Sequence, residues 1–337
     1  MKVEHDVPLA NTLRLPARAR HRVQLEQPGE LAQLLADTRW RDLPRTVLGE
    51  GSNVVLRGDV PGLVLQAAMR GMQVERWNGS EALVRCGAGE NWDALVRWSL
   101  AQGLAGLENL SLIPGSVGAA PFQNIGAYGV ELSDRLVSLR ACSLEDGRER
   151  EFSLAECGFA YRDSLFKSGQ PGRWLITEVQ LRLARDLPPV LDYADLAERF
   201  AALPAAQRHA AGLRDIICTL RRSKLPDPAQ LPNAGSFFKN PLVSAGQHAA
   251  LRERFPALVS YPQADGRFKL AAGWLIEQVG WKGRREGDVG MHAQQALVLV
   301  NHGQASGEQV LAVAAEVREA VRARFAVTLE QEPVILP

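Results

Sequence analysis

Two glycine-rich segments of this chain could bind a phosphorylated ligand, because each brings several backbone N–H groups together. The first consists of Gly49, Glu50, Gly51, Ser52 and Asn53. The second contains Pro114, Gly115, Ser116 and Gly118. Neither has the spacing of a dinucleotide fingerprint or the lysine of a P-loop, so each alone fits a tight turn as well as a diphosphate site. Their combination favours a protein that binds both ends of a dinucleotide.

Three polar side chains elsewhere could act on a substrate. Ser236 lies outside any nucleophile-elbow motif, so it is either a turn residue or a weak acid that protonates a strongly basic carbon. Arg162 either pairs with Asp163 at the surface or clamps a carboxylate through two hydrogen bonds. Glu332 lies near the C-terminus and, by residue type alone, is an exposed acid. These residues leave the chemistry open.

Composition narrows the class of protein. The chain has 337 residues, a length that suggests two or three domains. Its hydrophobic fraction of 46% is typical of globular proteins and sufficient for more than one hydrophobic core. Its net charge of +1 lacks the basic excess typical of nucleic-acid binding. No apolar stretch has the length of a membrane span, and the first residues do not resemble a signal peptide. We therefore expect a cytoplasmic protein with no nucleic-acid, membrane or obligate protein partner.

The four cysteines occur singly, at Cys86, Cys142, Cys157 and Cys218. This spacing lacks the paired ligands of a zinc site and the framework of a disulfide-rich domain, so we expect four reduced thiols and no metal.

The first half of the chain must position the glycine-rich segments. Short apolar runs predict strands at 46–48, 62–65, 82–84 and 179–183, and a hairpin over 136–152 with its turn at Asp146 and Gly147.

Helical spacing of apolar residues predicts a helix that Asn91 or Asp93 caps and Gly103 ends. The segment 113–129 has no clean period, and a long irregular stretch inside a domain is usually functional.

The second half begins after a predicted linker at Pro226, Asp227 and Pro228. It contains a helix over 271–279, a buried strand over 296–300, and a long helix that opens with a capping box from Ser306 to Gln309. A last strand over 326–329 and a short tail over 330–337 complete the prediction. Because regular βαβ alternation is missing, the pattern indicates an α+β fold rather than a doubly wound one.

Seven segments, taken together and in order, resemble the UDP-N-acetylenolpyruvoylglucosamine reductase (MurB) family. They are LGEGSN (48–53), NLSLIPGSVGAAPFQNIGAYGVEL (109–132), YRDSLFK (161–167), KLPDP…NAGSFFKNP (224–241), AAGWLIEQ (271–278), HAQQALVLVN (292–301) and LEQEPVIL (329–336). They span nearly the whole chain. The family often has LEPEV where this chain has LEQEP, so here a proline, Pro333, follows Glu332.

The resemblance implies a two-domain FAD-binding fold of the FAD-linked reductase (PCMH-like) type, with a third α+β domain for the substrate. The implied boundaries are 1–72 for the first FAD-binding subdomain, 73–225 with 326–337 for the second, and 226–325 for the substrate domain. Residues 191–196 resemble the Tyr-bearing insertion of one of the two family types.

The resemblance also implies a role for each matching residue. The two glycine-rich segments, with Asn124, Ile125 and Gly126, would contact FAD. Ser236 would be the proton donor, and Arg162 and Glu332 would complete the catalytic set. The UDP-sugar would be bound by Tyr193, Lys224, Asn240, Tyr261, Lys282 and Gln295. By residue type alone, Lys224 and Lys282 are solvated surface lysines.

The implied activity is the NADPH-dependent reduction of UDP-N-acetylglucosamine enolpyruvate to UDP-N-acetylmuramate in bacterial peptidoglycan precursor synthesis. FAD and NADPH are the implied cofactors, and no metal is implied. Two alternatives remain: an FAD oxidoreductase of similar fold that acts on another carboxylate, such as a hydroxy-acid oxidase, and a catalytically silent nucleotide-sugar sensor.

Overall fold

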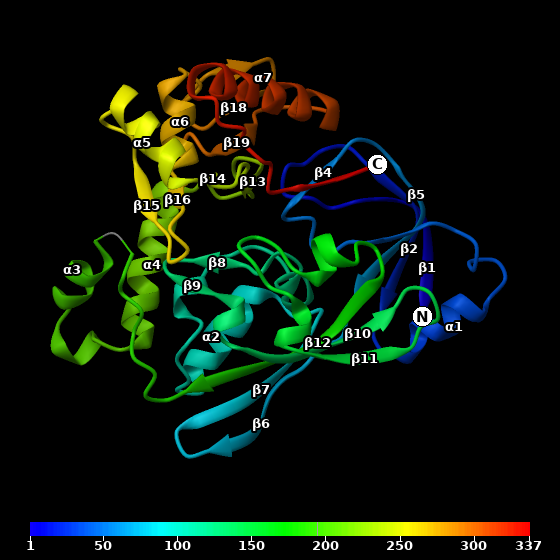
Figure 1. The fold of residues 1–337 in the computed structure, drawn as a ribbon. Coiled ribbons are helices and arrows are strands. Elements are labelled where there is room, and N and C mark those ends of the chain that lie inside the picture. Colours follow the sequence, from blue (N-terminus) through cyan, green and yellow to red (C-terminus); the bar gives the residue numbers. More distant parts are fainter. Residues whose placement is uncertain (194) are drawn as a thin grey trace. The chain divides into compact units, whose positions relative to one another are not determined.

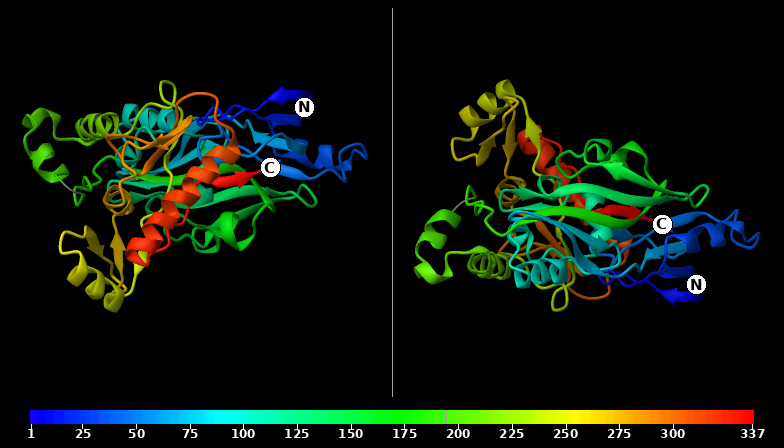
Figure 2. Two further views of the ribbon diagram at one scale, coloured as in Figure 1. Left: turned by 90° about the horizontal axis from the view of Figure 1, so that it is seen from above. Right: turned by 90° about the horizontal axis from the view of Figure 1, so that it is seen from below.

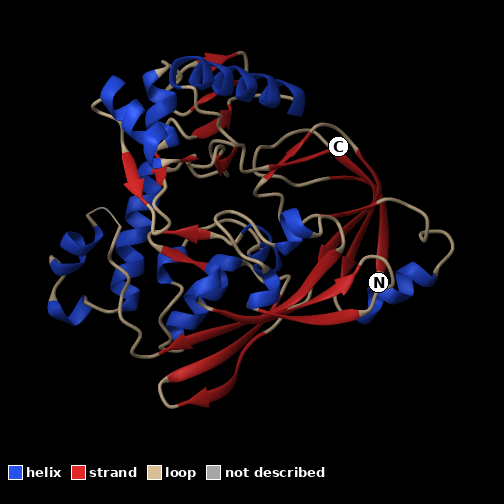
Figure 3. Cartoon of the chain, viewed as in Figure 1, coloured by secondary structure: helices blue, strands red, loops and turns tan. Residues whose placement is uncertain are grey.

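The computed structural model describes residues 1–193 and 195–337 and contains both helices and mixed parallel and antiparallel sheets, which confirms the α+β prediction. Figure 1 shows the course of the chain, and Figure 3 distinguishes its helices from its strands. The chain divides into two compact units. Unit 1 comprises residues 1–7, 19–50 and 60–223. Unit 2 comprises residues 8–18, 51–59 and 224–337. The three domain ranges implied by the resemblance stay a prediction.

Two sheets form the framework of unit 1. The first has the order β1-β2-β5-β3. The second has the order β11-β10-β12-β7-β6, and all five of its strands are labelled in Figure 1. The strands are β1 (Lys2–Pro8), β2 (Arg18–Leu25), β3 (Arg45–Val47), β5 (Val60–Ala67), β6 (Met72–Asn78), β7 (Glu81–Gly87), β8 (Gly126–Ala127), β9 (Val130–Glu131), β10 (Leu136–Ser143), β11 (Glu149–Ser153) and β12 (Trp174–Ala184). The helices are α1 (Gly29–Ala36), α2 (Trp92–Ala101), α3 (Leu196–Ala201) and α4 (Ala210–Lys224).

The predicted strands and hairpin of unit 1 are confirmed. Leu136–Ser143 pairs antiparallel with Glu149–Ser153, and the turn contains Gly147 with a positive φ of 73°. Asn91, not Asp93, caps α2, because its Oδ1 accepts a hydrogen bond from the Ala94 N–H at 3.1 Å. Such a cap satisfies one of the N–H groups left unpaired at a helix start.

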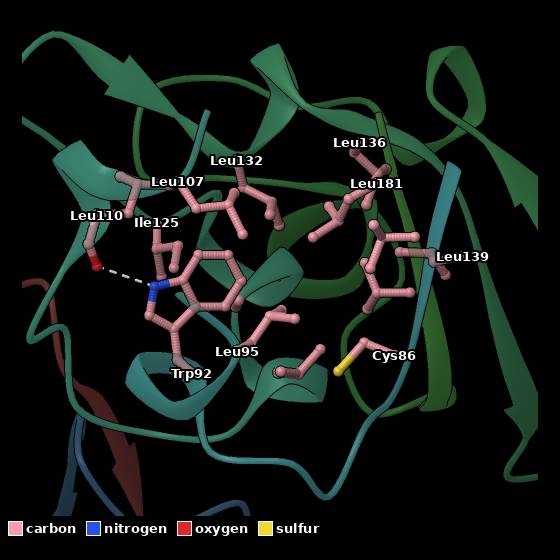
Figure 4. Packing of buried hydrophobic residues seen from close by; sticks show 14 of the residues in the cluster. Cys86, Trp92, Leu95, Leu107, Leu110, Ile125, Leu132, Leu136, Leu139 and Leu181 are labelled. Carbon is pink, nitrogen blue, oxygen red and sulfur yellow. Dashed lines mark hydrogen bonds between the residues drawn. The ribbon is translucent and has the colours of Figure 1, made fainter. Parts of the chain in front are cut away.

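The largest core of unit 1 lies between α2 and the five-stranded sheet. Trp92 is fully buried there, and its indole N–H donates to the Leu110 carbonyl at 2.9 Å (Figure 4). Leu95, Leu132 and Leu181 pack in the same cluster. This contact ties the irregular segment after α2 to the core, so a stretch without regular secondary structure is still held in a defined position.

All four cysteines are free, in agreement with the prediction of reduced thiols, and all four are buried. Burial raises the pKa of the Cys142 thiol to about 11 and that of Cys157 to about 12, so these thiols are protonated at neutral pH.

Unit 2 contains two small sheets, ordered β13-β19-β18-β17 and β14-β16-β15, and the parallel pair β20-β4. Its strands are β4 (Val54–Leu56), β13 (Asn233–Ser236), β14 (Leu242–Val243), β15 (Ser260–Pro262), β16 (Phe268–Leu270), β17 (Arg285–Glu286), β18 (Val289–Met291), β19 (Val298–Asn301) and β20 (Val334–Leu336). Its helices are α5 (Ala245–Arg254), α6 (Ala272–Gln278) and α7 (Gly307–Phe325). Helix α7 is the long helix that crosses unit 2 in the left view of Figure 2.

The capping box at the start of α7 is confirmed: the Ser306 side chain accepts from the Gln309 N–H at 3.3 Å, and the Gln309 side chain accepts from the Ser306 N–H at 2.8 Å. The strand predicted over 326–329 is wrong. Val327 and Leu329 are buried, so their spacing gives the alternating pattern of a half-buried strand. The hydrogen-bonded strand lies further along the chain, where β20 pairs in parallel with β4. The predicted short tail is therefore a paired strand.

Candidate active site

The first glycine-rich loop begins in unit 1, beside the second. The Gly49 carbonyl accepts from Gln66 Nε2 at 3.2 Å, and Glu50 Oε1 accepts from Asn91 Nδ2 at 3.3 Å. A Cβ placed on Gly49 would lie 3.1 Å from Ser116 Oγ. The two segments chosen from the sequence therefore lie close together, with little space between Gly49 and the Ser116 side chain.

The second loop is held by residues 87–91, the connection between β7 and α2. The N–H groups of Trp92, Val117 and Gly118 donate to the carbonyls of Gly115, Glu90 and Ala88 at 2.9, 2.8 and 2.8 Å. A Cβ on Gly118 would lie 2.6 Å from the Ala88 Cβ. Residues 87–91 therefore support the second loop, and the glycines allow two main chains to lie in contact.

The next predicted cofactor contacts, Asn124 to Gly126, form a tightly bonded turn. Asn124 is buried, has a φ of 45°, and donates through Nδ2 to Glu131 Oε2 at 2.7 Å. Its Oδ1 accepts from the Ser133 N–H at 3.0 Å. The Ile125 side chain points into the core of Figure 4. The side chains of Asn124 and Ile125 stabilise the turn. The main chain of residues 124–126 is therefore the part that could contact a cofactor.

Arg162 lies in unit 1 against this turn. Its Nη2 donates to the Gly126 carbonyl at 2.6 Å, and a Cβ on Gly126 would come within 2.9 Å of Arg162 Nη1. Arg162 has a φ of 56°, a left-handed conformation that costs a non-glycine residue about 1–3 kcal/mol. Such strain clusters at functional sites, so the conformation supports a role beyond a surface ion pair.

Arg221, on α4, is a residue that the sequence analysis did not single out. Burial, together with the nearby Arg162 guanidinium, lowers its pKa, and Tyr128 and Asp93 act in the opposite direction. Two guanidinium groups close enough to interact are stabilised by an anion between or beside them. From the sequence alone, Arg221 belongs to a charged helix face, so no local signal distinguishes it.

The remainder of the first loop belongs to unit 2. The Gly51 carbonyl accepts from the Thr12 N–H at 3.1 Å, and Gly51 has a φ of 69° with the position of its Cβ blocked by the Ala10 carbonyl. Thr12 Oγ1 donates to the Ser52 carbonyl at 3.2 Å. The loop from Gly49 to Asn53 is thus anchored at one end in each unit.

Ser236 follows a β-bulge in β13. Asn233 pairs with Val300 and Ser236 with Val298, so β13 carries one extra residue, and Gly235 within it has a φ of 72°. The buried Asn233 accepts from the Gly235 N–H at 2.8 Å. Bulges redirect side chains near active sites. Here the bulge sets the half-buried Ser236 at the end of the strand.

Glu332 lies beside the same strand end. Its N–H donates to the Phe237 carbonyl at 2.8 Å, and its carbonyl accepts from Asn53 Nδ2 at 3.5 Å. The Val334 N–H donates to the Asn53 carbonyl at 3.1 Å. The fold thus brings together three predicted site residues, Ser236, Glu332 and Asn53. Residue type alone made Glu332 an exposed acid, but it is half-buried, because the chain on both sides of it is paired.

The predicted UDP-sugar contacts fall into two groups. Asn240 and Gln295 both lie at the start of α6. Asn240 Oδ1 accepts from the Ala272 N–H at 2.9 Å, and Gln295 Oε1 lies 3.1 Å from a Cβ built on Gly273. The other four are exposed: Lys282, whose Nζ lies 2.9 Å from Glu277 Oε1, together with Lys224, Tyr193 and Tyr261.

Comparison with known proteins decides the family. The model of the UDP-N-acetylenolpyruvoylglucosamine reductase C-terminal domain matches residues 227–336, and that of an FAD binding domain matches residues 19–153. A UDP-N-acetylenolpyruvoylglucosamine reductase of Pseudomonas aeruginosa is 55% identical over 323 residues, which cover 96% of this chain and 95% of that protein. The chain belongs to the UDP-N-acetylenolpyruvoylglucosamine reductase family. It is therefore an FAD-dependent oxidoreductase.

Solved structures agree with this assignment. The reductase of Thermus caldophilus is 26% identical, with a TM-score of 0.67 and complete coverage of both chains. A 6-hydroxy-D-nicotine oxidase from Arthrobacter nicotinovorans shares the fold at 15% identity, with a TM-score of 0.53 over 97% of this chain and 86% of that one. The FAD-linked fold expected from the sequence is confirmed.

Two searches of residues 1–193 and 195–337 complete the description of the site. Within these ranges, no three His, Cys, Asp or Glu side chains are grouped so that they could hold a metal ion. No helix in the same ranges has the length and hydropathy needed to cross a membrane.

A Gly49→Ala substitution is expected to weaken FAD binding in this reductase about tenfold, since its Cβ would press on Ser116 Oγ and push the two loops apart. Absorbance at the flavin band relative to total protein, after dialysis, measures the loss. Gly58→Ala is the matched control, because a Cβ there meets nothing within 4 Å. Equal flavin retention in the two variants would contradict the prediction that the loop containing Gly49 contacts FAD.

Proposed function

We propose that this chain reduces the enolpyruvyl ether of UDP-N-acetylglucosamine enolpyruvate to a lactyl ether, with NADPH as reductant, in the cytoplasm. The product is UDP-N-acetylmuramate, a precursor of peptidoglycan. Family membership across nearly the whole chain supports the reaction, and the FAD binding domain supports a flavin route. The four free thiols are in keeping with a reducing compartment.

The two glycine-rich loops would hold FAD, and a bound flavin would supply the hydride-transfer chemistry that connects NADPH with the β-carbon of the enolpyruvyl group. Hydride transfer leaves an electron pair on the α-carbon, delocalised into the adjacent carboxylate. Ser236 donates its hydroxyl proton to that carbon, which completes the addition of two electrons and two hydrogens across the double bond. Serine is a weak acid, and the carbanion is a base strong enough to take its proton.

Arg162 stabilises the charge that develops on the substrate carboxylate. A guanidinium can donate two parallel hydrogen bonds to a carboxylate, and fixed donors of this kind typically contribute about 2.7–4 kcal/mol each. Its hydrogen bond to the Gly126 carbonyl and its left-handed backbone support a preset orientation. Glu332 orients the reacting group from the strand end that also carries Ser236.

Individual side chains, rather than an extended charged surface, bind the nucleotide-sugar in this proposal. Lys224 and Lys282 pair with the diphosphate, Asn240 and Gln295 with the sugar, and the exposed rings of Tyr193 and Tyr261 cover the substrate. Individual cations rather than a basic surface fit a chain whose net charge is +1.

The observation that carries the proposal is the hydrogen bond from the Glu332 N–H to the Phe237 carbonyl, at 2.8 Å. It supports the pairing of a proton donor and a carboxylate that are almost a hundred positions apart in the sequence.

Purified protein is expected to be yellow, to lose its absorbance near 450 nm under anaerobic NADPH, and to regain it on addition of UDP-N-acetylglucosamine enolpyruvate. NADH and UDP-N-acetylglucosamine serve as controls for reductant and substrate. A colourless protein, or a reduced flavin that this substrate leaves unchanged, would refute the proposed activity.

A further inference from the structure

A two-residue turn joins β8 to β9 and contains an unusual residue. Gly126 pairs with Glu131 and Ala127 with Val130, so Tyr128 and Gly129 form the turn. Both have positive φ, 50° and 84°, as a type I′ turn requires. Asparagine followed by glycine is the favoured pair at such a turn. A tyrosine in the first position is strained, and strain that persists points to a use for the side chain.

The Tyr128 ring contacts the segment that carries Tyr193. The two rings meet edge to face, with centroids 5.1 Å apart and an interplanar angle of 74°. Tyr128 also packs against an apolar cluster formed by residues of α3 and α4. The cluster consists of Leu196, Phe200, Leu213, Ile217 and Leu220. One side chain thus touches both Tyr193 and the helices that follow it.

A buried amide holds the two segments at a fixed distance. Asn109, only 1% exposed, donates through Nδ2 to the Tyr128 carbonyl at 2.8 Å and to the Val190 carbonyl at 3.0 Å. A Cβ on Gly129 would lie 3.3 Å from Val190 Cγ1, which shows how closely the turn and the segment before Tyr193 approach. The start of the Tyr193 segment is therefore fastened to the turn.

The same hairpin also contacts Arg162. Gly126, two residues before Tyr128, provides the carbonyl that accepts from Arg162 Nη2 at 2.6 Å. Arg221 interacts electrostatically with both Tyr128 and Arg162. All these contacts lie within unit 1. Any displacement of the hairpin would move the supports of Arg162 and Tyr193 together.

We infer that Tyr128 is a positioning residue for Tyr193, whose exposed ring it supports in the orientation that meets the nucleotide-sugar. The inference rests on the proposed function, in which Tyr193 contacts the substrate. The hairpin from Gly126 to Glu131 then links two tasks: it orients Arg162 for the carboxylate and Tyr193 for the remainder of the substrate.

Three variants of the flavin-loaded full chain and one double variant test this role. Tyr128→Asn removes the ring but keeps, and locally favours, the type I′ turn. We expect it to raise KM for UDP-N-acetylglucosamine enolpyruvate about tenfold, to change kcat less than twofold, and to leave flavin reduction by NADPH unchanged. Tyr193→Ala should have a similar effect. Tyr128→Phe retains the ring contact and should restore KM to within twofold of wild type.

The double variant Tyr128→Asn/Tyr193→Ala separates positioning from general stability. If Tyr128 acts through Tyr193, the double variant should raise KM no further than Tyr193→Ala alone. Hydrogen exchange of residues 186–192 should rise in Tyr128→Asn without substrate present. Should Tyr128→Asn fail to fold, Tyr128→His, which tolerates positive φ, takes its place in the same measurements.

Three outcomes would overturn the inference: an unchanged KM in Tyr128→Asn, multiplied effects in the double variant, or an unchanged KM in Tyr193→Ala. None of them resembles failure of the proposed function, in which wild-type protein would lack flavin or would not pass electrons to this substrate.

Discussion

Ser236→Ala is expected to leave the reduction of bound flavin by NADPH within twofold of the wild-type rate, while reoxidation by substrate slows by about 10²–10⁴-fold. The range is typical for the loss of a positioned general acid. The two half-reactions respond differently because the serine proton is needed only after hydride has reached the substrate. Anaerobic stopped-flow absorbance near 450 nm measures each half-reaction separately.

Ser244→Ala is the matched control for this variant. Ser244 lies in the same unit and caps α5, where its Oγ accepts from the Gln247 N–H at 3.2 Å. Loss of this cap should cost about 1 kcal/mol of stability and leave both half-reactions intact. Solvent deuterium should slow reoxidation in the wild type. Equal slowing of both half-reactions in Ser236→Ala would remove the serine from the role of proton donor.

Glu332→Gln is expected to lower turnover by about 10²–10³-fold with little loss of FAD, as when one fixed electrostatic group is removed from an active site. The backbone contacts of Glu332 to Phe237 and Asn53 involve main-chain atoms of Glu332, so the substitution leaves them in place. Steady-state NADPH oxidation at saturating substrate measures the effect, and the flavin absorbance measures cofactor content.

Glu330→Gln provides the comparison two residues away. Its side chain is 74% exposed, and its carboxylate lies 3.3 Å from Lys239 Nζ. An ion pair whose acid faces solvent in this way contributes about 1 kcal/mol at most. Turnover in Glu330→Gln should stay near that of the wild type. If both variants kept full activity, Glu332 would be an ordinary acid at the chain end, as its residue type alone indicated.

The two arginines of unit 1 show where analysis of the sequence stops. Arg162 was selected because its motif matches the family, but neither its left-handed backbone nor its contact with Gly126 has a sequence signature. Arg221 was missed altogether, since a basic residue in a charged helix normally faces solvent. Its position near Arg162 depends on how α4 packs against the hairpin of β8 and β9, which involves residues almost a hundred positions apart.

Local interactions explain the elements that were predicted correctly. The cap at Asn91, the capping box at Ser306 and Gln309, and the hairpin turn at Gly147 each depend on residues within a few positions of one another. Such signals are complete in the sequence. The strand predicted over 326–329 is wrong because the pattern reports burial alone. Val327 and Leu329 are both buried, but a strand also needs a neighbouring strand to which its backbone can hydrogen-bond.

The sequence by itself determined the chemistry available to this protein, because glycine-rich loops, a serine, an arginine and a terminal carboxylate are identities that folding does not change. It also determined the family, through motifs that retain their order along the chain. Only the tertiary structure decided that Glu332 and Asn53 meet at the end of the strand that carries Ser236. Those contacts run through backbone N–H and carbonyl groups, which every residue has, and so they leave no pattern in the side chains.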